Sequence, residues 1–136
     1  MKPAAATSAR QALALRLAAL VMFTGLPGVL LPGQSLEKFS WFVGYGQPRL
    51  DPLSIFMTAD AASASVLLGL VLGFLARDPE RYQPLVRLLS RAFLVASPVW
   101  ISLGLQCPLP WWWTASAAAG LLALGLALRA TAATNA

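Results

Sequence analysis

A carboxylate inside an apolar segment is the first residue of this sequence that could do chemistry. Asp60 lies a turn or two inside a run of apolar side chains, where an ionised carboxylate is costly unless it is paired, hydrated or protonated. One interpretation is a site for a proton, a cation or a polar ligand head group. The other is a buried hydrogen-bond acceptor that ties helices together, or a carboxylate that stays hydrated near the membrane surface. Hydroxyl partners at a similar predicted depth are Thr24, Ser102 and Thr114.

The second interpretation is favoured for Asp60, because a single acid without another titratable partner makes a poor proton relay. Arg49, in the preceding loop, is the one cation expected to reach this carboxylate.

Three arginines form a second candidate site. Arg87 and Arg91 are four residues apart, so a helix places them on one face, and Arg16 falls at a similar depth in the first apolar segment. This grouping is typical of a pocket for an anionic lipid head group. The alternative is that the side chains extend to the membrane surface and pair with Asp78 or Glu80.

Residue types that are missing exclude much chemistry. The sequence has no histidine, the commonest general base and a frequent ligand of haem, copper, zinc and iron. Its single cysteine, Cys107, cannot form an internal disulfide or a two-cysteine redox pair. No nucleophile–base pair is visible. We therefore expect no metal site, no cofactor of the chain's own and no enzymatic activity.

The composition identifies the solvent of these side chains as lipid. Hydrophobic residues make up 58% of the 136 residues and charged residues 11%, against about 25% charged residues in a soluble domain. No charged residue occurs from Ala92 to Leu128. The formal charge of +5 does not indicate a nucleic-acid partner, because the cations are scattered near helix ends. Membrane lipids are the expected surroundings.

The pattern of apolar segments predicts an all-α fold, a membrane four-helix bundle forming a single domain over 1–136. Four segments are long enough to cross a bilayer. We expect Pro27 to kink the outer end of the first segment and Pro98 to kink the third. A short amphipathic helix is predicted at about 36–43, in the first outer loop, with Leu36, Phe39, Phe42 and Val43 on its apolar face. The predicted spans are about 11–31, 53–76, 84–106 and 111–128.

The distribution of lysine and arginine predicts the orientation. Only Lys38 and Arg49 fall on one side of the predicted spans, and the excess on the other side puts both termini in the cytoplasm. The composition also suggests a bacterial protein, and hence the inner membrane. The cations assigned to the cytoplasmic side are Lys2, Arg10, Arg16, Arg77, Arg81, Arg87, Arg91 and Arg129.

Tryptophans mark the opposite surface of the membrane. Trp41 and the consecutive Trp111, Trp112 and Trp113 are typical of an interfacial aromatic belt. Consecutive helical residues point in different directions, so the three cannot all face one pocket. A bound lipid, or a flat lipophile such as a quinone or a carotenoid, could stack on one of them at the periphery.

Small residues follow two of the spans at intervals of four. Such stripes let helix backbones approach closely, either inside the bundle or against another subunit. Two stripes are more than one small bundle needs, so we expect at least one to meet a transmembrane partner. The stripes are Ala61, Ser65, Gly69 and Gly73 in the second span, and Ala115, Ala119, Ala123 and Ala127 in the fourth.

The stretch from Ser54 to Val86 resembles small bacterial four-helix membrane proteins of the BphX-like and DoxX-like groups. The resemblance lies in the intramembrane Asp60, the spaced glycines after it and the segment from Ala76 to Val86, which contains an arginine–aspartate–proline turn. It implies four spans and a site at Asp60. Those groups often carry acidic residues in the third span, where this chain has arginines. Some DoxX-like proteins are subunits of membrane oxidoreductase assemblies, and the resemblance implies such a role here.

Three functions follow from these patterns. The first is a non-catalytic accessory or assembly subunit of a larger inner-membrane complex, most consistent with a bioenergetic one. The second is a small transporter or lipophile-binding protein organised around Asp60. A membrane enzyme acting on lipids is the third, and it lacks a visible nucleophile–base pair.

Overall fold

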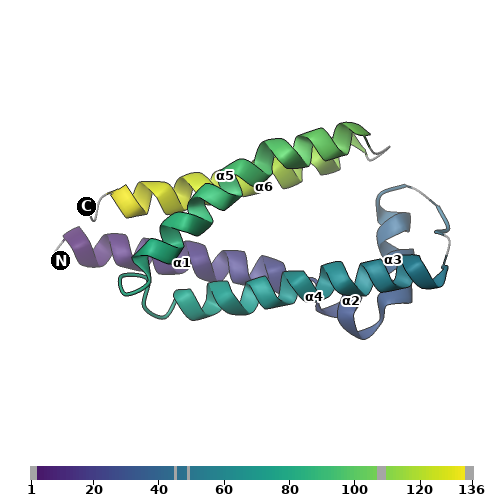
Figure 1. Ribbon diagram of the computed structural model, residues 1–136, viewed down its shortest axis with the longest axis horizontal. Coiled ribbons are helices and arrows are strands. Elements are labelled where there is room, and N and C mark those ends of the chain that lie inside the picture. Colours follow the sequence, from purple (N-terminus) through teal and green to yellow (C-terminus); the bar gives the residue numbers. More distant parts are fainter. Residues whose placement is uncertain (1–2, 45, 49, 107–109, 134–136) are drawn as a thin grey trace. The chain divides into compact units, whose positions relative to one another are not determined.

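The chain is a multi-pass membrane protein built from helices. The computed structural model describes residues 3–44, 46–48, 50–106 and 110–133, and this part of the chain holds helices and no strand (Figure 1). Four stretches are long and apolar enough to cross a membrane, which confirms the predicted all-α fold with four spans. They are Ser8–Leu30, Pro52–Leu75, Gln83–Gln106 and Trp111–Ala130. Lys2, Arg49 and Cys107 lie outside the described residues.

The first span is broken rather than kinked. Helix α1 covers Pro3–Phe23 and helix α2 covers Leu26–Leu30, with Thr24 and Gly25 between them. Pro27 explains the break, because proline has no N–H to donate to the carbonyl of Phe23 one turn earlier. The Thr24 hydroxyl donates a 2.7 Å hydrogen bond to the Val21 carbonyl, which satisfies one of the acceptors left free at the end of α1.

A short helix follows, four residues earlier than the sequence pattern predicts. Helix α3 covers Pro32–Phe42, with a proline in its first turn, where no N–H is needed. The chain turns away from the helix at Gly44, whose φ of +82° only glycine adopts readily. Ser40 and Val43 are buried, whereas Phe42, predicted on the apolar face, is exposed.

Three long helices make up the rest of the chain. Helix α4 covers Pro52–Leu75, and Asp51 caps it by accepting hydrogen bonds from the backbone N–H and hydroxyl of Ser54. Both hydrogen bonds lower the pKa of Asp51, and the one from the backbone N–H has the larger effect. Helix α5 covers Gln83–Gln106 and continues through Pro98, and helix α6 covers Trp111–Ala133.

The chain divides into two compact units. One consists of residues 18–72 and the other of residues 1–17 with 73–136. The single domain predicted from the sequence stays a prediction, and each unit is described by itself below.

In the unit of residues 18–72, the end of the first span packs against α4 through residues without bulk. A Cβ atom at Gly28 would lie 2.7 Å from the Ala62 Cβ, and one at Gly69 would lie 3.1 Å from the Met22 Cβ. A side chain at either glycine would therefore push the helices apart. This close approach is the packing that small residues permit between helices in a membrane.

In the other unit, α5 and α6 form an antiparallel hairpin and run side by side (Figure 1). The Ser90 hydroxyl donates to the Gly125 carbonyl at 2.8 Å, and the Ser97 hydroxyl donates to the Ala118 carbonyl at 2.9 Å. One heptad further along α5, Gly104 lies so close to Thr114 that a Cβ atom there would overlap it. Small residues at intervals of seven therefore hold this hairpin together.

The other end of α5 is tied to α1 and to the turn before it. The Gln11 side chain is fully buried, and its amide Nε2 donates to the side-chain Oε1 of Gln83 at 3.3 Å. The Tyr82 ring lies 5.2 Å from the Phe74 ring, between their centroids. The turn between α4 and α5 is closed by the Asp78 carboxylate, which accepts from the Arg81 backbone N–H at 3.1 Å.

Candidate functional site

Asp60 lies on the side of α4 that faces away from the first span. It is two residues from the packed Ala62, so roughly 200° around the helix from it. Its side chain is exposed and forms no hydrogen bond or ion pair within the described part of the chain. Within its own unit, Asp60 thus contributes nothing to the contact between α4 and the first span.

The hydroxyl groups predicted to surround Asp60 have other environments. Thr24 belongs to the same unit as Asp60, but its hydroxyl donates to Val21. Ser102 and Thr114 belong to the other unit. Ser102 accepts hydrogen bonds from the Gln106 amide, and Thr114 is buried beside Gly104 with its hydroxyl oxygen unpartnered in the described structure. The predicted polar cluster is therefore divided between the two units.

The three predicted lipid-binding arginines all belong to the unit that contains the α5–α6 hairpin. Arg16, Arg87 and Arg91 are exposed, next to the buried Leu15, Val86 and Ser90 in sequence. Across the described residues, neither Arg87 nor Arg91 forms an ion pair with Asp78 or Glu80. The guanidinium of Arg81 instead lies 5.7 Å above the Tyr82 ring. The arginines of α5 thus keep their charges available to an anionic group.

The small residues of α4 and α6 differ in what they contact. In α4, Gly69 is buried against Ala19 and Met22, Gly73 is half-buried, Ser65 donates to the Ala61 carbonyl and Ala61 is exposed. In α6, Thr114, Ala118 and Gly125 contact α5. The predicted stripe of α6 lies beside this face, and its members Ala115, Ala119 and Ala123 are exposed.

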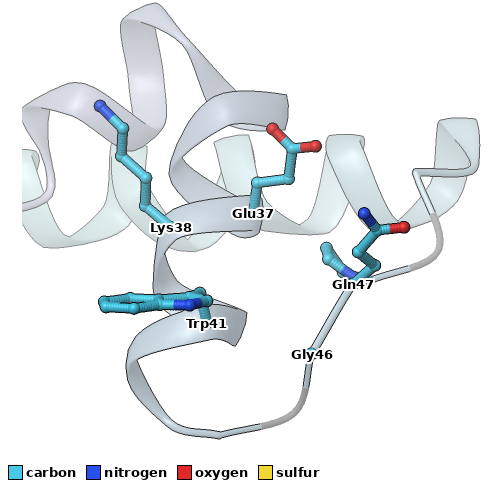
Figure 2. Close-up of a pocket in the computed structure, with 6 residues that line it drawn as sticks. Glu37, Lys38, Trp41, Gly46 and Gln47 are labelled. Carbon is cyan, nitrogen blue, oxygen red and sulfur yellow. The ribbon is translucent and has the colours of Figure 1, made fainter.

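A pocket of about 330 Å³ opens on α3 and the loop behind it. Glu37, Lys38 and Trp41 line it from the helix, and Gly46, Gln47 and Pro48 line it from the loop (Figure 2). Sequence analysis identified Trp41 as a membrane anchor but missed the pocket. The signal was the spacing of Glu37 and Trp41 by four residues, followed by two glycines that turn the chain back.

The aromatic residues predicted to form the belt differ in exposure. Trp41 is 80% exposed and Trp111 is 81% exposed, and their position at the membrane interface stays a prediction. Trp112 is 40% exposed and its ring meets that of Trp113 edge-on at 6.0 Å. Stacking of a lipid or a flat lipophile on one of these rings stays a prediction.

No group of three or more potential metal-ligating side chains occurs among the residues that the structure describes. No known protein family, curated protein or solved structure matches the chain.

Proposed function

We propose that this protein is a non-catalytic accessory or assembly subunit of a larger membrane complex, and that α6 docks against a transmembrane helix of a partner. The observation that carries the proposal is the division of α6 into two small-residue faces. Ala118 and Gly125 pack on α5, whereas Ala119 and Ala123 are exposed and nothing lies within 4 Å of a Cβ atom at Gly120. We name the exposed residues Ala115, Ala119, Gly120 and Ala123 the docking face.

Small exposed residues in a membrane helix favour close packing against another helix. Lipid tails are as apolar as alanine, so exposing alanine to lipid costs little free energy. Small side chains stabilise a membrane helix only where they let another helix approach closely. The docking face would let a partner's backbone approach as closely as α5 does on the other side of α6.

We also propose that the complex is a bioenergetic one in a bacterial inner membrane. The absence of histidine and the single cysteine argue against catalysis by the chain itself. The resemblance to DoxX-like subunits of oxidoreductase assemblies supports a bioenergetic complex. The excess of lysine and arginine on one side of the spans supports a bacterial inner membrane with both termini in the cytoplasm.

Recovery of partner subunits with two matched variants tests the docking face. Gly120→Leu and Ala119→Leu should reduce the amount of partner that copurifies with the tagged chain, while the purified variants unfold at the same detergent or temperature midpoint as the wild type. Unchanged recovery for both variants would argue against docking. A lowered unfolding midpoint of the purified chain would instead assign this face to packing within the protein.

The position of Asp60 favours a second candidate function. We propose as the alternative a small transporter or lipophile-binding protein organised around this carboxylate. Its exposed position on α4, away from the first span and unpartnered in the described structure, leaves it available to a proton, a cation or a ligand.

A further inference from the structure

The alignment of the α5–α6 hairpin places two arginines from different helices at the same level. The hydrogen bond from Ser90 to the Gly125 carbonyl marks one level of this antiparallel pair (Figure 1). Arg87 lies three residues before Ser90, and Arg129 lies four residues after Gly125. Because the helices run in opposite directions, both arginines lie about one turn beyond the hydrogen bond, toward the same end of the hairpin.

The two arginines also lie on the same side of the hairpin. Each comes directly after a fully buried residue, Val86 in α5 and Leu128 in α6. A local two-fold axis relates two packed antiparallel helices, and it keeps equivalent positions on one side of their contact. Arg87 and Arg129 are therefore neighbours across the contact between α5 and α6.

These neighbouring charges have no acidic partner in the part of the chain that the structure describes. Arg87 and Arg129 are both exposed, and neither forms an ion pair with a described residue. Helices α5 and α6 contain no aspartate or glutamate at all. Like charges side by side repel each other, so an anion bound between the two guanidinium groups would stabilise both.

The position of the pair in the spans indicates what kind of anion this is. Arg87 lies four residues inside the span Gln83–Gln106, and Arg129 is next to the last residue of the span Trp111–Ala130. Arginine side chains near the end of a span extend to the level of the lipid head groups. One heptad nearer the middle of α6, on the same side, Leu122 is 44% exposed. A phosphate with an apolar tail matches this surface.

We propose that Arg87 and Arg129 together bind the phosphate of an anionic phospholipid of the glycerol type, with an acyl chain along Leu122. Guanidinium groups bind phosphate oxygens through paired N–H donors. An anionic lipid is favoured over a zwitterionic one because neither helix has a carboxylate for an ammonium group. Sequence spacing grouped Arg87 with Arg91 and Arg16, and the hairpin adds Arg129. The site does not depend on the proposed docking of α6.

Native mass spectrometry of the full chain in mild detergent tests this site. The protein is supplied with equal amounts of phosphatidylglycerol and phosphatidylethanolamine that carry identical acyl chains. The wild type should retain the glycerol lipid preferentially. Arg87→Gln and Arg129→Gln should each lower this retention about fivefold, the effect of one cation on the binding of an anionic lipid.

Arg81→Gln is the matched control. It removes the same charge from the same unit, but from a guanidinium that lies over the Tyr82 ring, so the retention should stay unchanged. Circular dichroism checks that the variants have equal helix content. Equal losses in all three variants, or no preference for the glycerol lipid in the wild type, would overturn the proposal. Displacement of the lipid by excess inorganic phosphate would overturn it too, because the acyl chain would then contribute nothing.

Discussion

Asp60 is the residue on which the two proposed functions disagree. The sequence favours a hydrogen-bond acceptor that ties helices together, with Thr24 or Ser102 as a donor. Thr24 donates to Val21 instead, and Asp60 lies on the other side of α4 from the first span. A carboxylate in that position stabilises no contact within its unit.

We therefore expect Asp60→Asn and Asp60→Leu to change the free energy of unfolding by no more than about 0.5 kcal/mol, as for exposed positions in general. Denaturation in mixed detergent micelles measures this. For an accessory subunit, partner recovery should also be unchanged in Asp60→Asn. Loss of transport or ligand binding in Asp60→Asn, at normal protein level, would favour the alternative function.

Gln11 and Gln83, unlike Asp60, have buried polar atoms in their side chains. Gln11 Oε1 and Gln83 Nε2 are both buried and have no partner among the described residues, although the two side chains share one hydrogen bond. Removing one amide leaves the other with no partner at all, which costs about 1–3 kcal/mol for a buried polar group.

A double-mutant cycle tests this pair. Gln11→Leu and Gln83→Leu should each lower the unfolding free energy by about 1–3 kcal/mol, and the double variant should lose less than their sum. Unfolding in denaturing detergent gives the three values. Additive losses would show that the two amides do not depend on each other.

At the scale of elements, the hairpin of α5 and α6 depends on small residues at its contact. A Cβ atom at Gly125 would lie 2.9 Å from Leu94 Cγ and 3.2 Å from the Leu94 backbone nitrogen, whereas Gly120 on the same helix has open space. Gly125→Leu should destabilise the protein by about 1–3 kcal/mol through overpacking.

Gly120→Leu is the matched control, because it makes the same change in helix propensity without the collision. It should leave the unfolding midpoint of the isolated chain unchanged. Equal destabilisation by the two variants would show that the hairpin seam has been assigned to the wrong face of α6.

The sequence predicts the spans well and their packing faces poorly. Span positions follow from hydropathy, since lipid thickness fixes the length of an apolar helix. Helix α6 is apolar on all sides and carries small residues from Ala115 to Gly120 without a break, so spacing alone cannot select a face. The contacts from Ser90 and Ser97 of α5 do select one.

For the pocket on α3, the sequence indicates the wall on the helix, where Glu37 and Trp41 are four residues apart, but not the wall formed by the loop. Its walls depend on the backbone of Gly44 and Gly46, and a glycine in a loop predicts freedom rather than a particular φ. The break at Thr24 was predicted in part. Pro27 predicts that the helix is disturbed there, but it does not determine whether the helix bends or stops.

For the whole molecule, the distribution of cations makes a direct prediction about orientation. A reporter that is active only in the cytoplasm should be active when fused after Ala136 and silent when inserted at Gly46. Expression is checked by immunoblotting in both fusions. The opposite pattern of activity would reverse the orientation and place the α3 pocket on the cytoplasmic side.

The central claim is that this chain works as part of a larger membrane complex. The mass of the native particle, measured after extraction of the tagged full-length chain from its own membrane in a mild detergent, tests it most directly. We predict a particle that contains additional transmembrane subunits and loses them in Gly120→Leu. A stable particle that contains only this chain and its lipids would contradict the claim.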